Sequence, residues 1–170
     1  MNSCQAVAHL GPIIFLTKRE NYDKKSEFTT IKEEPMNPDD LKYHKEHIWV
    51  RMSGRKLTIG ITDYAQDALG DIVYVDLPEV DTDVEANSEI GEIESTKATS
   101  SIISPVSGRV TEVNDDLSES PEIINEDPYG KGWFAIIEAP NADADRAKLL
   151  DPQAYFKVMQ LQIEKELKES

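Results

Sequence analysis

Short runs of alternating apolar and polar residues dominate the chain between residues 41 and 137. Runs of this kind, rich in β-branched and aromatic residues and bounded by Gly, Pro, Asn or Asp, are typical of β-strands, and roughly seven of them occur here. The predicted strands lie within residues 41–43, 47–51, 56–61, 71–77, 91–103, 109–113 and 133–137. So many short strands in so small a chain predict a mainly β sandwich or barrel with helices at its margins.

Two helices are predicted beside these strands. Thr62 can cap a short internal helix over residues 63–69, and Gly70 suits the left-handed position at its C-terminus. Asp151 and Pro152 have the chemistry of a helix start. Behind them, apolar side chains recur every four residues, at Tyr155, Met159, Ile163 and Leu167. This period predicts an amphipathic helix at the C-terminal end.

A polar stretch separates two apolar pairs near the middle of the chain. Ile90 and Ile93 precede it, Ile102 and Ile103 follow it, and no large apolar side chain lies between them. This pattern predicts a hairpin with Lys97 at its tip, where the ammonium group stays hydrated and a modifying enzyme can reach it. For one of thirteen lysines taken at random, a solvated loop residue without a special role is the simpler interpretation.

Composition divides the chain into three parts. Residues 1–38 form an N-terminal extension whose polar and charged stretch is predicted to be disordered, residues 39–140 form the β domain, and residues 141–170 form a helical segment that packs on it. The apolar run over residues 6–16 is too short for a membrane span and has no positive charge before it. We therefore expect neither a signal peptide nor a transmembrane helix, and a cytoplasmic location.

The chain is strongly acidic, with 33 acidic against 18 basic residues and a net charge of −15. The excess lies mainly in residues 41–170, which hold 26 acidic and 13 basic side chains. Such a surface repels nucleic acid and anionic membranes, so we expect neither as a partner and expect basic protein surfaces instead. Cys4 is the only cysteine, which excludes an intramolecular disulfide.

The sequence offers no catalytic constellation. It contains no G-x-S-x-G, P-loop, G-x-G-x-x-G or H-E-x-x-H motif. His44 and His47 are close in sequence, but two imidazoles without a third ligand make a poor metal site. We therefore predict no catalytic residue and no metal, and we expect Trp49 and Trp133 to belong to the core.

Seven segments between Leu41 and Ile137 resemble the H-protein family of the glycine cleavage system in order and spacing. They are His47-x-Trp49-Val50, residues 60–66, residues 69–75, Leu77-Pro78, Glu94-Ser95-x-Lys97-Ala98, residues 104–108 and Pro128-Tyr129-x-x-Gly132-Trp133. The resemblance implies a barrel-sandwich hybrid fold of the lipoyl-domain type with C-terminal helices. It also implies a lipoyl carrier without catalytic activity of its own.

The family's lipoate is joined by an amide bond to the lysine that matches Lys97. The hairpin context of this lysine comprises Glu94, Ser95, Thr96, Ala98 and Gly108, all of which match the family except Thr96, which stands where valine is common. The implied role is to shuttle an aminomethyl group between glycine decarboxylase, aminomethyltransferase and dihydrolipoyl dehydrogenase. A lipoate ligase or lipoyltransferase would attach the cofactor. Biotinyl domains usually place Met on both sides of their lysine, which makes lipoate the better cofactor prediction here.

This chain departs from the family pattern at two acidic positions. Family members usually have Glu where it has Ile48, and Asp where it has Ser101. Both acids belong to the pocket that shelters the cationic arm, so His47, Ile48 and Ser101 are the arm-pocket candidates. Loss of two carboxylates favours a rival role as a lipoate-binding protein of another pathway, such as sulfur oxidation or a lipoyl relay. An unmodified structural or adaptor domain is a third alternative.

Overall fold

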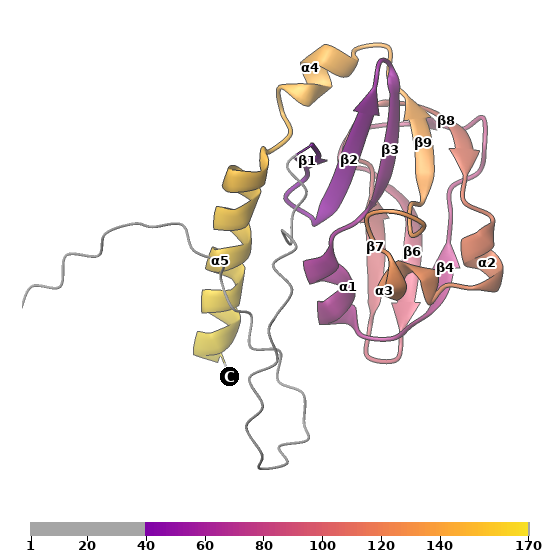
Figure 1. Cartoon of the computed structure of the whole chain (residues 1–170). Coiled ribbons are helices and arrows are strands. Elements are labelled where there is room, and N and C mark those ends of the chain that lie inside the picture. Colours follow the sequence, from indigo (N-terminus) through magenta and orange to yellow (C-terminus); the bar gives the residue numbers. More distant parts are fainter. Residues whose placement is uncertain (1–39, 170) are drawn as a thin grey trace, which may run out of the picture. The chain divides into compact units, whose positions relative to one another are not determined.

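The computed structural model describes residues 40–169, and within this range nine strands form two antiparallel sheets (Figure 1). The six-stranded sheet consists, in spatial order, of β1 (Lys42–Tyr43), β2 (Ile48–Ser53), β3 (Lys56–Ile61), β9 (Ala135–Glu138), β8 (Gly108–Val113) and β5 (Asp83–Val84). The three-stranded sheet consists of β4 (Ile72–Asp76), β6 (Glu89–Ser95) and β7 (Thr99–Ile103). The predicted mainly β, two-layered fold is confirmed, whereas the predicted extension over residues 1–38 lies outside the described residues.

Five helices accompany the sheets. They are α1 (Asp63–Leu69), α2 (Asp116–Glu119), α3 (Ile123–Glu126), α4 (Ala142–Arg146) and α5 (Pro152–Glu169). The two predicted helices correspond to α1 and α5, and Thr62 caps α1 by accepting a hydrogen bond from the amide of Ala65 at 3.4 Å. Figure 1 shows α1 and α3 at the same end of the molecule as the turn between β6 and β7.

The main core fills the space between the two sheets. The six-stranded sheet contributes Ile59, Val110 and Ile137, and the three-stranded sheet contributes Ile93 and Ile102, all at most 1% exposed. Burial of a large aliphatic side chain contributes about 1.5–3 kcal/mol, so these residues supply much of the driving force for folding. Ile93 and Ile102 thus anchor the hairpin of β6 and β7 in the main core.

A second apolar cluster lies on the opposite face of β2. Ile48 and Val50 point into the main core, whereas Trp49, between them, points the other way and joins Tyr43 and Met159 in this cluster. The indole N–H of Trp49 donates to the carbonyl oxygen of Pro128 at 2.8 Å. Burial of Trp49 agrees with its predicted place in the core.

The aromatic ring of Tyr155 attaches α5 to the β domain. It stacks on Tyr43 with 4.6 Å between ring centroids and 10° between ring planes. Its hydroxyl lies 2.8 Å from Oγ1 of Thr62 and 2.8 Å from Nδ1 of His47. Burial raises the pKa of the Tyr155 hydroxyl, so the group stays protonated and can keep both contacts.

His47 is held in an unusual backbone conformation in the turn before β2, with φ at 61°. Its Nε2 lies 3.0 Å from Oε1 of Gln162, which can only accept, so Nε2 carries the proton and Nδ1 accepts from Tyr155. Burial lowers the pKa of His47, and this effect outweighs the opposing influence of Gln162 and nearby carboxylates. The imidazole is therefore neutral at neutral pH.

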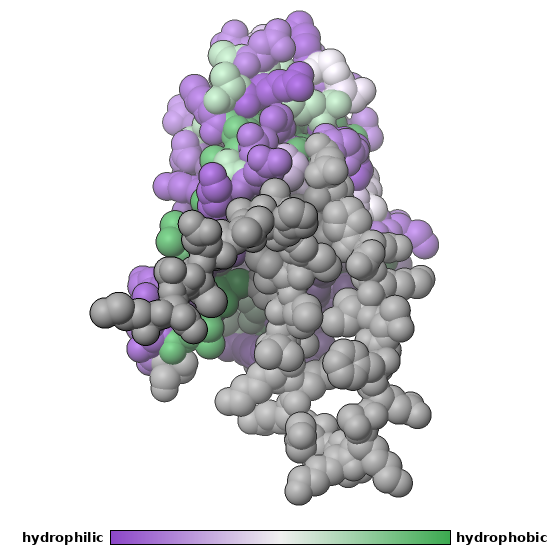
Figure 2. All heavy atoms as spheres, turned by 60° about the vertical axis from the view of Figure 1, so that its left-hand side comes forward, coloured by the Kyte–Doolittle hydropathy of each residue, from purple (hydrophilic) through white to green (hydrophobic). Residues whose placement is uncertain are grey.

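Part of the described surface is dominated by hydrophilic side chains. On the face shown in Figure 2, the upper part, at the height of α4 in Figure 1, is mostly hydrophilic. Among the helices in residues 40–169, none combines the length and the apolar character needed to cross a membrane.

The attachment of α5 yields the first prediction. Tyr155→Ala should lower the free energy of unfolding by about 3–5 kcal/mol because a large buried ring is lost. Tyr155→Phe, which keeps the stacking and loses only the hydroxyl contacts, should cost about 1 kcal/mol. Urea denaturation followed by circular dichroism measures both. Leu161→Ala, on the same helix but 68% exposed, is the control, and a Tyr155→Ala effect no larger than that of the control would contradict the packing role.

The lowered pKa of His47 yields a prediction about pH. The unfolded chain, with an ordinary pKa of 6.5 at this residue, takes up a proton more readily than the folded chain does. The His47 contribution to stability is therefore complete above that value and declines as the pH falls through it. The free energy of unfolding is measured by urea denaturation at pH 7.5 and at pH 5.5, both about one unit from the ordinary His value. Between these two pH values it should fall more in the wild type than in His47→Asn.

Asn is a suitable replacement because it tolerates positive φ and does not titrate. Identical losses of stability in the wild type and in His47→Asn would show that His47 does not contribute to the pH dependence.

Candidate functional site

Lys97 lies at the tip of the hairpin that joins β6 to β7. The tip is a tight turn in which the amide of Ser95 donates to the carbonyl oxygen of Ala98 at 2.8 Å. The Ser95 hydroxyl oxygen accepts hydrogen bonds from the amides of Lys97 at 3.2 Å and Ala98 at 3.1 Å. Thr96, Lys97 and Ala98 are all exposed. The turn is thus braced by its own serine while the lysine side chain faces solvent.

A neighbouring segment supports this turn from outside. The amide of Thr96 donates to the carbonyl oxygen of Asp71 at 3.0 Å. Gly70, which ends α1 with φ at 77°, lies under the lysine stem, since a Cβ placed on it would sit 3.2 Å from Cε of Lys97. The backbone at the root of Lys97 is therefore fixed on two sides.

Glu94 and Gly108, which were both predicted to surround Lys97, lie on different strands. Glu94 lies on β6, exposed and opposite Thr99, as expected for a residue just before the turn. Gly108 does not belong to the hairpin: it begins β8 in the six-stranded sheet, opposite Val84. A Cβ there would collide with the carbonyl oxygen of Glu138, so this glycine permits close approach of two backbones.

A hollow of about 370 Å³ lies beside β7. It is lined by residues 44–47 of the turn before β2, by Asn87, and by Ser100, Ser101 and Ile103 of β7. Ser101 is the third residue of β7, four residues after Lys97. The structure thus brings His47 and Ser101, two of the three arm-pocket candidates, to one hollow on the strand that leads away from the lysine.

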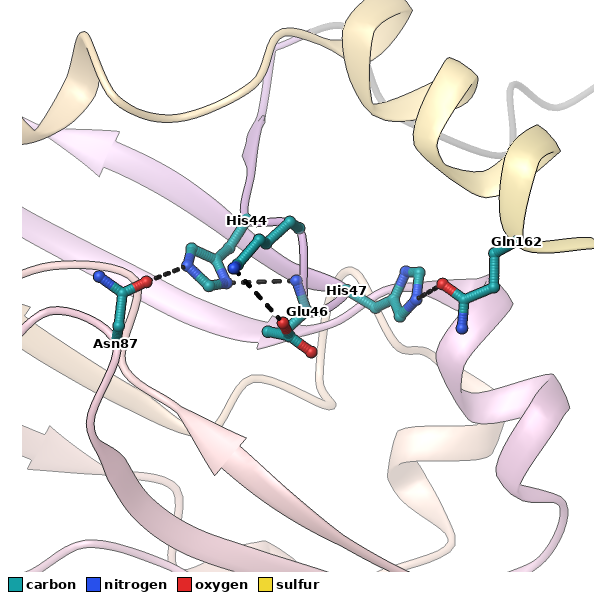
Figure 3. Close-up of polar contacts among 6 residues, drawn as sticks. His44, Glu46, His47, Asn87 and Gln162 are labelled. Atoms are coloured by element: carbon teal, nitrogen blue, oxygen red, sulfur yellow. Dashed lines mark hydrogen bonds and ion pairs between the residues drawn. The ribbon is translucent and has the colours of Figure 1, made fainter. Parts of the chain in front are cut away.

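Figure 3 shows the two histidines at this hollow pointing in different directions. His44 points to Asn87, with 2.9 Å between Nε2 and Oδ1, and its Nδ1 accepts from the amide of Glu46. His47 points to Gln162 on α5. Both rings already use both nitrogens for hydrogen bonds within the protein. Among residues 40–169, no group of three or more His, Cys, Asp or Glu side chains could hold a metal ion.

Ile48 and Ser101 occupy different environments. Ile48 is 1% exposed, packs in the main core and does not line the hollow. Ser101 is exposed, and its hydroxyl donates to Oε2 of Glu89 at 2.8 Å. A carboxylate is therefore present next to Ser101, supplied by the neighbouring strand.

Glu89 was not predicted from the sequence, because its position depends on an irregularity in the hairpin. The pairing of β6 with β7 shifts between Glu89 and Gly91, so Glu89 stands opposite Ile103. Without this shift Glu89 would face the other side of the sheet from Ser101. A bulge of this kind leaves no clear mark in the pattern of apolar residues.

A larger and more open hollow of about 750 Å³ contains none of the predicted site residues. Its lining includes the acidic side chains of Asp76, Glu79, Asp83, Glu85, Glu89 and Glu92. Asp83 also pairs with Arg109 at 3.0 Å, and this hydrogen bond lowers the pKa of the Asp83 carboxyl. These carboxylates give this side of the three-stranded sheet a strongly negative character.

The residues at the hairpin fit a covalently attached acyl group. Lys97 offers a primary amine at an exposed position, its stem passes over a residue without a side chain, and a polar hollow lies farther along the same strand. No nucleophile, base and orienting acid come together there in the way that nucleophilic catalysis needs. The arrangement can hold and present a group.

Comparison with known proteins identifies the family. The model of the glycine cleavage H-protein family matches residues 41–162. The glycine cleavage system H protein of Carboxydothermus hydrogenoformans is 48% identical over 123 residues, which cover 72% of this chain and 94% of that protein. The H protein of Stenotrophomonas maltophilia is 50% identical over 124 residues, with the same coverage.

A solved structure agrees with these relatives. The crystal structure of a glycine cleavage system H protein from Mycobacterium marinum matches with a TM-score of 0.65 and 37% identity, over 70% of this chain and 95% of that one. Residues 41–162, which the family model matches, include the hairpin of Lys97 and the hollow beside it. The resemblance seen in the sequence motifs is confirmed: the chain belongs to the glycine cleavage H-protein family, whose members are lipoyl carriers without catalytic activity of their own.

Proposed function

We propose that Lys97 is the lipoylated residue and that the chain carries cargo for glycine cleavage on this arm. The observation that carries the proposal is the contrast between the exposed lysine and its fixed root. Ser95 braces the turn from within, and the carbonyl oxygen of Asp71 holds it from outside. A swinging arm needs this combination, because the reactive end must travel while its origin stays in place.

Lipoate, joined to Nζ of Lys97, would supply a dithiolane that can be reduced and can carry a group. The protein's own residues would hold the root and shelter the far end. The lining of the hollow beside β7 includes His47 and Asn87, which already make hydrogen bonds within the protein. It also includes Ser101, whose hydroxyl donates to the Glu89 carboxylate. A carboxylate near the hollow suits a cargo that bears a positive amine.

The partners proposed from the family are glycine decarboxylase, aminomethyltransferase and dihydrolipoyl dehydrogenase. A lipoate ligase or lipoyltransferase would attach the cofactor. The net charge of −15 supports partners with basic docking surfaces, because complementary charge accelerates association. The cytoplasmic location stays a prediction from the sequence.

The departures at Ile48 and Ser101 weigh less against glycine cleavage than the sequence alone indicated. Ile48 packs in the core and lines no part of the hollow. Beside Ser101, Glu89 brings a carboxylate within hydrogen-bond distance of the position where the family usually has Asp, although Glu89 itself lines the larger hollow. The alternative is that the chain carries cargo for another lipoyl pathway, such as sulfur oxidation or a lipoyl relay. The loading experiment below distinguishes this alternative from glycine cleavage.

Attachment at Lys97 is tested by intact mass. Protein made in cells supplied with lipoate should gain one lipoyl-sized increment, and Lys97→Arg should gain none. Lys131→Arg changes another exposed loop lysine and should be modified like the wild type. An increment that persists in Lys97→Arg, or is missing from the wild type, would reject this attachment site.

The cargo is tested by loading. The lipoylated chain, with its dithiolane in the oxidised disulfide form, is incubated with glycine decarboxylase and glycine, and the mass of the aminomethylated product is followed. In this step the glycine carboxyl group leaves as CO2, the remaining aminomethyl group bonds to one sulfur, the S–S bond breaks, and the other sulfur becomes a thiol. The wild type should load, and Glu89→Gln should load several-fold more slowly because a charge-assisted hydrogen bond contributes about twice as much as a neutral one. Ser101→Asp should load at least as well as the wild type.

Failure of the wild type to load, with loading restored in Ser101→Asp, would favour the other lipoyl pathways. Ile48→Glu is not a useful variant because it would bury a carboxylate in the main core.

A further inference from the structure

Asn125, on α3, joins backbone groups beside the Lys97 hairpin and has no part in the function proposed above. Its Oδ1 accepts a hydrogen bond from the amide of Ile72 at 3.0 Å. Its Nδ2 donates to the carbonyl oxygen of Gly70 and to Oε1 of Gln66, both at 2.9 Å. One side chain therefore holds both ends of residues 70–72, which lead from the end of α1 to the first residue of β4.

The same short segment supports the root of Lys97. Asp71 lies between the two residues that Asn125 holds, and its carbonyl oxygen accepts the hydrogen bond from the Thr96 amide at 3.0 Å. Gly70 lies under the stem of Lys97, since a Cβ placed on Gly70 would sit 3.2 Å from Cε of Lys97. The position of the hairpin tip thus depends on residues 70–72, and the position of these residues depends on Asn125.

The backbone groups around Asn125 require an amide side chain. The N–H of Ile72 can only donate and the carbonyl oxygen of Gly70 can only accept, so the side chain between them must offer an acceptor and a donor. Aspartate would place a carboxylate oxygen against the Gly70 carbonyl. Asn125 is itself held in place, because the preceding residue, Ile124, is fully buried in the main core.

We propose that Asn125 is a positioning residue for Lys97. It holds residues 70–72 in one conformation, and these residues hold the tip of the hairpin where an attaching enzyme meets the amine. The inference rests on the proposed function only in that Lys97 is the modified residue. A root that is already ordered loses less conformational entropy when the enzyme binds, so it should lower the KM for the carrier.

The test compares Asn125→Asp and Asn125→Ala with a matched control, all in the full chain. Asn114→Asp is the control because the Nδ2 of Asn114 also donates to two carbonyl oxygens, those of Lys131 and Trp133, both at 2.8 Å. It removes similar bonds from a different part of the fold. Asn125→Ala introduces no charge and serves if Asn125→Asp does not fold.

Two quantities are measured. The first is the amide hydrogen exchange of Thr96, relative to that of the buried Ala139, whose amide donates to the carbonyl oxygen of Arg55 at 2.9 Å. The second is the steady-state kinetics of lipoylation by a purified lipoate ligase, with the carrier as the varied substrate. In both Asn125 variants, relative protection of Thr96 and kcat/KM should each fall about tenfold, the latter mainly through KM. Asn114→Asp should leave both within about twofold of the wild type.

A purely structural role for Asn125 would give a different result: both quantities would stay unchanged, or would change equally in the control. That result, with the wild type normally lipoylated, overturns the positioning role alone. A wild type that the ligase does not modify overturns the proposed attachment at Lys97, and the positioning role with it.

Discussion

The apolar contact between the two sheets is the constraint on which the rest of the structure depends. Ile93 and Ile102, on the two strands of the hairpin, are buried in it, and they fix the strands that end at the polar turn. Because this anchor is strong, the turn can be made of small polar residues and an exposed lysine without loss of order. Hydrogen bonds accepted by the Ser95 hydroxyl and by the carbonyl oxygen of Asp71 then determine the conformation of the last few residues.

The features predicted correctly from the sequence are those set by local pattern. Alternation located most of the strands, and the polar gap between isoleucines located the hairpin tip. The helical period in the last segment predicted α5 and its contact through Tyr155 and Met159, both fully buried. The same period overestimated the contact at its far end, since Leu167 is 73% exposed. A period shows which side chains share a face, but not how far the neighbouring surface extends.

The features that the sequence did not predict depend on distant partners or on irregular geometry. Glu89 reaches Ser101 only because of a shift in strand register, and Asn125 is linked to residues 70–72 from a helix of four residues. Gly108 was grouped with the residues of the hairpin context, but it begins β8 in the six-stranded sheet, which follows the hairpin in sequence. Ile48 was assigned to the pocket, although the alternation along β2 directs it into the core with Val50.

For the lipoyl arm proposed at Lys97, the fixed root would have a consequence for transfer between partners. A group tethered at a stationary point explores only the volume that its own tether allows, so its effective concentration near the hollow beside β7 is set by tether length and is on the order of millimolar. Looseness at the root would enlarge that volume and dilute the group. Order in the backbone of residues 70–72 would therefore control local concentration at the end of the arm proposed at Lys97.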